Sequence, residues 1–172
     1  MGKLVIDVAD LVHRPGAGKA INFAVPVEGL KGVLGRIEDG DPVELDLSAE
    51  SVREGVWVFG DVAGTLHLQC SRCLVEYEQR FEKQVDEIFY YDLDMAEAKD
   101  SYAVTDNHLD LEPMIRDAVV LDIPTHPVHS EACKGLCPVC GADRNVENCG
   151  HDAAPVDLRW APLQSILGPQ KG

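Results

Sequence analysis

The segment from Cys133 to His151 constrains this chain most, because it places four cysteines and a histidine within nineteen residues. Two residues separate Cys137 from Cys140, and the following Gly141 can adopt the positive φ that turns backbone amides toward two thiolate sulfurs. A tetrahedral zinc ion needs four ligands at about 2.0 to 2.3 Å. Cys149 and His151 can supply the second pair. Cys133 is then an alternative to His151 or a ligand of a different site.

The ligand set of this segment favours a structural zinc ion. Buried thiols or disulfides are the alternative, but the segment has few large apolar residues for a core to pack around. A reducing compartment also favours metal over disulfides. A catalytic zinc keeps one coordination position open, whereas this segment has more candidate ligands than positions.

A second C-x2-C pair, Cys70 and Cys73, interrupts a strongly alternating stretch from Val56 to Tyr90. The alternation predicts two long strands joined at these cysteines, and a hairpin tip can offer two sulfurs to a metal. His129 and Cys133 could complete such a second site. A redox pair is the alternative, but a thioredoxin-like C-x-x-C opens a helix rather than a strand.

The remaining pattern predicts an α+β fold. Shorter apolar runs indicate strands near residues 4–8, 20–27 and 43–47, residues 92–107 read as a loop, and a helix is expected at about 110–122. We therefore expect a mainly antiparallel β domain with one packed helix at residues 1–124. Residues 125–172 would form a cysteine-rich, zinc-knuckle segment that ends in a short helix beginning near Asp157.

The chain is acidic, with 30 Asp and Glu against 15 Lys and Arg. Residues 70–132 carry fifteen acidic and five basic side chains, and no basic stripe occurs anywhere. Direct binding to a phosphate backbone is therefore not expected, and a basic protein partner fits better, although acidity can also serve solubility alone. No apolar run is long enough for a signal peptide or a membrane span, so we expect a cytoplasmic protein with no membrane partner.

Several motifs in order resemble the DUF177 family, also called the YceD-like or large ribosomal RNA subunit accumulation proteins. The resemblance covers about residues 55–167 and rests on Leu68-Gln69-Cys70-Ser71-Arg72-Cys73-Leu74, Leu109-Asp110-Leu111-Glu112-Pro113 with Ile123-Pro124, Cys133 through Asp143, and Asp157 through Leu163. The family often closes with C-x-C where this chain has Cys149-Gly150-His151. Because His is also a zinc ligand, this departure affects only the identity of the fourth ligand.

The resemblance implies a ribosome biogenesis factor, not an enzyme, that supports synthesis, processing or protection of the large-subunit 23S rRNA. The resemblance also implies that some family members lack most of the C-terminal cysteines. The metal would then have a structural role rather than being the seat of the family's activity. The partner would be a ribosomal protein or a large-subunit assembly intermediate, with rRNA contacted indirectly and no small-molecule substrate.

Two other functions compete with this expectation. Either cysteine pair could sense oxidation by releasing zinc. A zinc hydrolase or deaminase is the other alternative, because His129-Ser130-Glu131 precedes Cys137-Pro138-Val139-Cys140. In deaminases those two motifs open separate helices, and the five residues between Glu131 and Cys137 cannot form a helix and a return connection.

Overall fold

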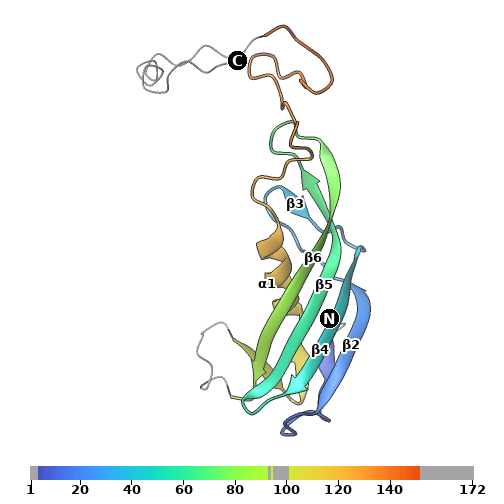
Figure 1. Ribbon diagram of the computed structural model, residues 1–172, viewed down its shortest axis with the longest axis vertical. Helices are drawn as coiled ribbons and strands as arrows, with labels where there is room; N and C mark the ends of the chain where they lie inside the picture. Colours follow the sequence, from blue (N-terminus) through green and yellow to red (C-terminus); the bar gives the residue numbers. More distant parts are fainter. Residues whose placement is uncertain (1–3, 93, 95–100, 152–172) are drawn as a thin grey trace. The chain divides into compact units, whose positions relative to one another are not determined.

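The computed structural model describes residues 4–92, 94 and 101–151 (Figure 1). The described residues fall into two compact units. One is drawn from Met1–Ser71 and Val75–His129, and the other from Arg72–Leu74 and Ser130–Gly172. Within the described ranges, no helix is long and apolar enough to cross a membrane.

The first unit is built on one eight-stranded sheet, in which the strands follow the order β1-β8-β7-β6-β5-β4-β2 and β3 pairs with β5. All pairs are antiparallel except β6 with β7. The strands are β1 (Val5–Asp7), β2 (Gly18–Pro26), β3 (Gly35–Arg36), β4 (Pro42–Ser51), β5 (Gly55–Gln69), β6 (Glu76–Tyr90), β7 (Tyr102–Thr105) and β8 (His108–Asp110).

The hairpin of β5 and β6 dominates the sheet (Figure 1), and its strands pair along their full length, from Gly55 opposite Tyr90 to Gln69 opposite Glu76. Side chains alternate between the two faces of each strand, so one face of β4, β5 and β6 is apolar and buried. That inner face carries Val43, Leu45, Leu47, Ala49, Val56, Val58, Val62, Leu66, Leu68, Phe81, Val85 and Phe89. The strands predicted between Val56 and Tyr90 are confirmed.

The helix α1 (Glu112–Asp122) contributes to the same core through its buried residues Met114, Ile115 and Val119. The Asp110 carboxylate accepts a hydrogen bond from the Glu112 amide at 3.1 Å and so satisfies one backbone donor of the first turn. The helix ends where Ile123 becomes extended (ψ 117°), as expected for a residue before proline. The helix predicted at about 110–122 is confirmed.

The predicted α+β class is wrong, because nearly all regular secondary structure in the described part of the chain is strand and the single helix there has 11 residues. Part of the excess strand comes from residues 92–107, which we expected to be a loop but which contain β7. Phe89 of β6 stacks on Tyr102 of β7, with ring centroids 5.2 Å apart, and this long-range contact has no local sequence pattern. The short helix expected from Asp157 lies outside the described residues.

Candidate metal centres

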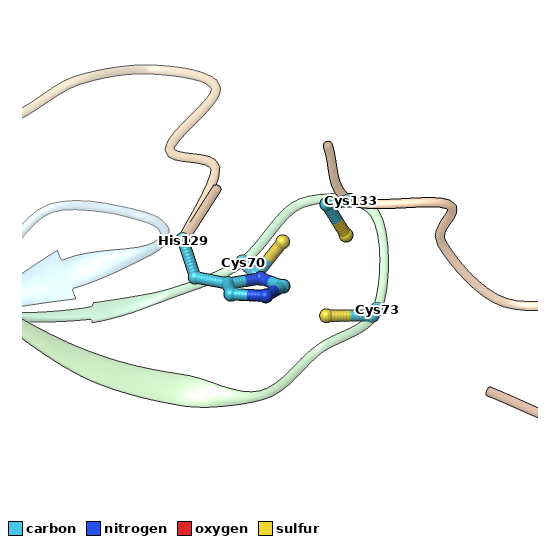
Figure 2. Close-up of side chains that lie close together, drawn as sticks. All are labelled: Cys70, Cys73, His129 and Cys133. Atoms are coloured by element: carbon cyan, nitrogen blue, oxygen red, sulfur yellow. The ribbon is translucent and has the colours of Figure 1, made fainter. Parts of the chain in front are cut away.

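The side chains of Cys70, Cys73, His129 and Cys133 lie close together (Figure 2), with one ligand atom from each within 4.8 Å of the others. We name these four residues the hairpin cluster. The three cysteines are buried, at 0%, 7% and 6% exposure, and His129 is exposed. Cys70 and Cys73 are placed by the turn that joins β5 to β6.

The hairpin turn has a residue in the left-handed conformation directly after its C-x2-C pair. The Cys70 amide donates to the Val75 carbonyl at 2.9 Å, which closes the turn, and Leu74 has a φ of 63°. A positive φ is unfavourable for leucine and marks a backbone held by its surroundings. The same conformation directly follows the second C-x2-C pair, where Gly141 has a φ of 75°. Both pairs therefore end in the same kind of turn.

Two polar side chains outside the ligand set support the backbone and the sulfur of Cys133. The Arg72 guanidinium donates to the Cys133 carbonyl at 3.1 Å. The side-chain amide of Asn145 lies 3.6 Å from the Cys133 sulfur, and its oxygen accepts from the Lys134 amide at 2.8 Å. Amide donors of this kind stabilise a thiolate and orient it. We did not anticipate either residue, because nothing in the local sequence pattern relates Arg72 or Asn145 to Cys133.

The second group of ligand atoms belongs to Cys137, Cys140, Cys149 and His151, which also lie within 4.8 Å of one another. We name these residues the C-terminal cluster. The Gly141 amide donates to the Cys137 carbonyl at 2.9 Å, and the Cys137 amide donates to the Ala142 carbonyl at 2.8 Å. These bonds close a tight loop around the C-x2-C pair.

The electrostatics of the C-terminal cluster favour a thiolate. Hydrogen bonds from the backbone amides of Cys140 and then Val139 lower the pKa of Cys137 from 9.0 to about 6, despite opposing burial. For Cys140, the Ala142 amide lowers the pKa, but burial and the neighbouring Cys137 and Cys149 sulfurs raise it above the ordinary value. One thiolate is thus stabilised before any cation arrives, and the accumulation of negative charge on further sulfurs requires a cation.

The structure brings together every ligand that the sequence indicated, in two groups of four. Cys137, Cys140, Cys149 and His151 form one group, while Cys133 lies with Cys70, Cys73 and His129. The spacing of Cys133 left both placements open. No disulfide joins any of the six cysteines, all of which lie in described ranges.

Each cluster fits the requirements of a tetrahedral zinc ion. Each supplies three sulfurs and one imidazole, a Cys3His set that occurs in structural zinc sites. Ligands around zinc lie about 3.3 to 3.8 Å from one another, so atoms already within 4.8 Å need only small side-chain movements. The two groups found in the described residues could therefore each hold a metal ion.

Comparison with known proteins connects the chain to a family. Residues 58–167 match the family described as large ribosomal RNA subunit accumulation protein YceD. This range includes β6, α1 and all eight residues of the two clusters. No solved structure matches the chain.

Relatives occur in bacteria and in a plant. An uncharacterized protein of Mycobacterium tuberculosis is 38% identical over 172 residues, which cover 97% of this chain and 83% of the relative. The uncharacterized protein YlbN of Bacillus subtilis is 32% identical over 108 residues, which cover 62% of this chain and 63% of the relative. The chloroplastic large ribosomal RNA subunit accumulation protein YCED homolog 1 of Arabidopsis thaliana is 25% identical over 158 residues, which cover 74% of this chain and 49% of the relative.

Proposed function

The chain belongs to the YceD family of large ribosomal RNA subunit accumulation proteins, and from this premise we propose that it is a non-enzymatic ribosome biogenesis factor. It would support the synthesis, processing or protection of the large-subunit 23S rRNA. The observation that carries the proposal is the family match over residues 58–167. The name of the Arabidopsis relative describes that protein as a large ribosomal RNA subunit accumulation protein.

The proposed metal is zinc, with one structural ion in each cluster. Sulfur and imidazole ligands suit zinc, and four protein ligands leave no coordination position open for a substrate or a catalytic water. His129 also belongs to a different cluster from Cys137 and Cys140, so the pattern that resembles a deaminase is divided between two groups. Both observations support a non-enzymatic role.

The proposed partner is a basic protein segment, such as part of a ribosomal protein or of an assembly intermediate. Support comes from the outer face of β4, β5 and β6, opposite the buried face. Three adjoining depressions of about 360, 190 and 360 Å³ follow this face. The first and second share Glu44 and Arg80, and the second and third share His67 and Glu78.

We name this surface the acidic groove. Its carboxylates are Glu38, Asp41, Glu44, Asp46, Asp61, Glu76, Glu78 and Glu82. Its two arginines are already engaged: Arg36 pairs with Glu38 at 3.0 Å and with Glu76 at 3.5 Å, and Arg80 pairs with Glu44 at 2.7 Å.

Several groove carboxylates have no ion pair of their own. Asp46, Asp61 and Glu82 form none within the described part of the chain, although Glu82 is near enough to Arg80 to help raise its pKa. Asp46 and Asp61 also lie directly opposite each other on β4 and β5, an arrangement that destabilises a sheet. A lysine- or arginine-rich segment would relieve this repulsion, whereas an RNA phosphate backbone would increase it.

The biological role is tested by depleting the protein in its own organism and measuring the ratio of 23S to 16S rRNA. We expect the ratio to fall and to recover when the intact chain is expressed. An unchanged ratio after complete depletion would reject the role in rRNA accumulation.

The partner proposal has a separate test in binding of the purified chain to an arginine-rich peptide and to naked rRNA across salt concentrations. We expect peptide binding that weakens with salt and no comparable RNA binding. A groove variant with three neutralised acids should bind the peptide less than a variant neutralised to the same degree elsewhere. The groove variant is D46N/D61N/E82Q, and the matched control is E54Q/D94N/D106N, whose three residues are exposed and line none of the three depressions. Equal binding by the two variants would reject the acidic groove as the docking surface.

A further inference from the structure

The two clusters differ in how well solvent reaches their ligands. In the C-terminal cluster only Cys137 is buried, at 3% exposure, while Cys140 and His151 are exposed and Cys149 is half-buried. In the hairpin cluster all three cysteines are buried. A competing ligand must reach a bound ion to remove it, so the C-terminal cluster is the more accessible of the two.

In the part of the chain that the structure describes, no apolar core surrounds the C-terminal cluster. No residue from 138 to 151 is buried, and its larger apolar side chains, Val139 and Val146, are 60% and 83% exposed. Apart from the contacts of Asn145 with Lys134 and Cys133, the hydrogen bonds of this segment join residues close in sequence, such as that from the Val146 amide to the Asp143 carbonyl at 3.1 Å. Bonds of this kind contribute little net stability in water. The ordering of residues 138–151 therefore requires another source of free energy, which a bound metal supplies.

The hairpin cluster, in contrast, adjoins strands that have a buried apolar core. Cys70 directly follows β5 and Cys73 precedes β6. The buried residues of these strands include Leu66, Leu68 and Phe81. These strands are stabilised by their own core, so the β5–β6 hairpin does not depend on a metal for its fold.

We propose that Cys137, Cys140, Cys149 and His151 form an exchangeable zinc site, so that residues 138–151 are folded only while zinc is bound there. The ion in the hairpin cluster is retained under the same conditions. The C-terminal segment thereby responds to zinc supply independently of the β sheet. This inference rests on the zinc assignment in the proposed function, but not on the role in rRNA accumulation.

The test uses the full chain produced with zinc and mixed with a colorimetric zinc chelator. We expect two zinc equivalents per chain, one released in a fast phase and the other in a slow phase. Cys140→Ser should remove the fast equivalent, and Cys73→Ser the slow one. His151→Cys should keep both equivalents, because a thiolate is also a zinc ligand.

Hydrogen exchange provides a second readout that does not depend on how well each variant folds. Removal of the fast equivalent from the unaltered chain should abolish amide protection in residues 138–151 and leave β5 and β6 protected. Release of both ions in one phase, a fast phase that persists in Cys140→Ser, or continued protection of residues 138–151 would overturn the proposal. A chain that binds no zinc would overturn both zinc assignments, while the 23S to 16S ratio in depleted cells would still test the biological role separately.

Discussion

Replacing Gly141 with alanine isolates the contribution of backbone conformation to the C-terminal cluster. Gly141 has a φ of 75°, and a Cβ atom added there would meet no atom within 4 Å. The substitution therefore creates no clash, and its cost is the strain of a left-handed conformation, roughly 1 to 2 kcal/mol for a residue other than glycine. Because folding of this segment is coupled to metal binding, the strain should appear in the zinc affinity.

An energy of this size corresponds to zinc binding about 5- to 30-fold weaker at the C-terminal cluster. Competition titration with a chelator of known affinity measures it on the full chain, and the ion of the hairpin cluster serves as an internal reference. An affinity unchanged by Gly141→Ala would refute the coupling between this turn and the metal.

The equivalent position in the hairpin cluster offers the reverse substitution. Leu74 has a φ of 63° and is 52% exposed, so replacing it with glycine relieves strain and sacrifices little burial. The relief of roughly 1 to 2 kcal/mol is partly offset by about 0.5 to 1 kcal/mol of lost backbone entropy. Because the β5–β6 hairpin folds without a metal, we expect Leu74→Gly to raise the free energy of unfolding of the sheet by up to roughly 1.5 kcal/mol and to leave the zinc affinity of the hairpin cluster nearly unchanged. A lower free energy of unfolding in a denaturant melt would show that the leucine side chain, rather than the turn, stabilises the hairpin.

Two further substitutions test the electrostatics of the sheet. Asp61→Asn removes repulsion with Asp46, so it should raise the free energy of unfolding by roughly 0.2 to 1 kcal/mol in low salt. A denaturant melt in high salt should show a smaller gain, because salt screens the repulsion. An equal gain at both salt concentrations would contradict this cause. Burial, then Asp86 and Asp117, raise the pKa of Glu87. Ionisation of Glu87 therefore destabilises the folded state as the pH rises through the folded-state pKa. Glu87→Gln should raise the melting temperature at pH 7, but it should have no such effect at a pH below 4.5, the ordinary pKa of Glu87. A similar gain at both pH values would reject that cause.

The long hairpin and the helix were predictable because their patterns are local. Residues from Val56 to Tyr90 alternate with a period of two, and Asp110 to Pro124 gives helix signals at both ends. The assignment of residues 92–107 as a loop failed because β7 is defined by long-range contact with β6. Sequence patterns alone give no measure of such contacts.

The candidate sites were predictable only in part, for the same reason. The ligand residues follow from the chemistry and spacing of Cys and His, but the position of Cys133 depends on tertiary structure. The acidic groove was also only partly foreseen. The sequence drew attention to residues 70–132, whereas Glu44, Asp46 and Asp61 join the same surface only through strand register. The positive φ of Leu74 runs against the preference of leucine and has no sequence signal.

The metal content of the intact chain tests the central claim most directly. Elemental analysis of freshly isolated protein should find two zinc ions per chain, and Cys137→Ser should retain one. A folded chain that contains no zinc and keeps its eight ligand residues in place would contradict the account.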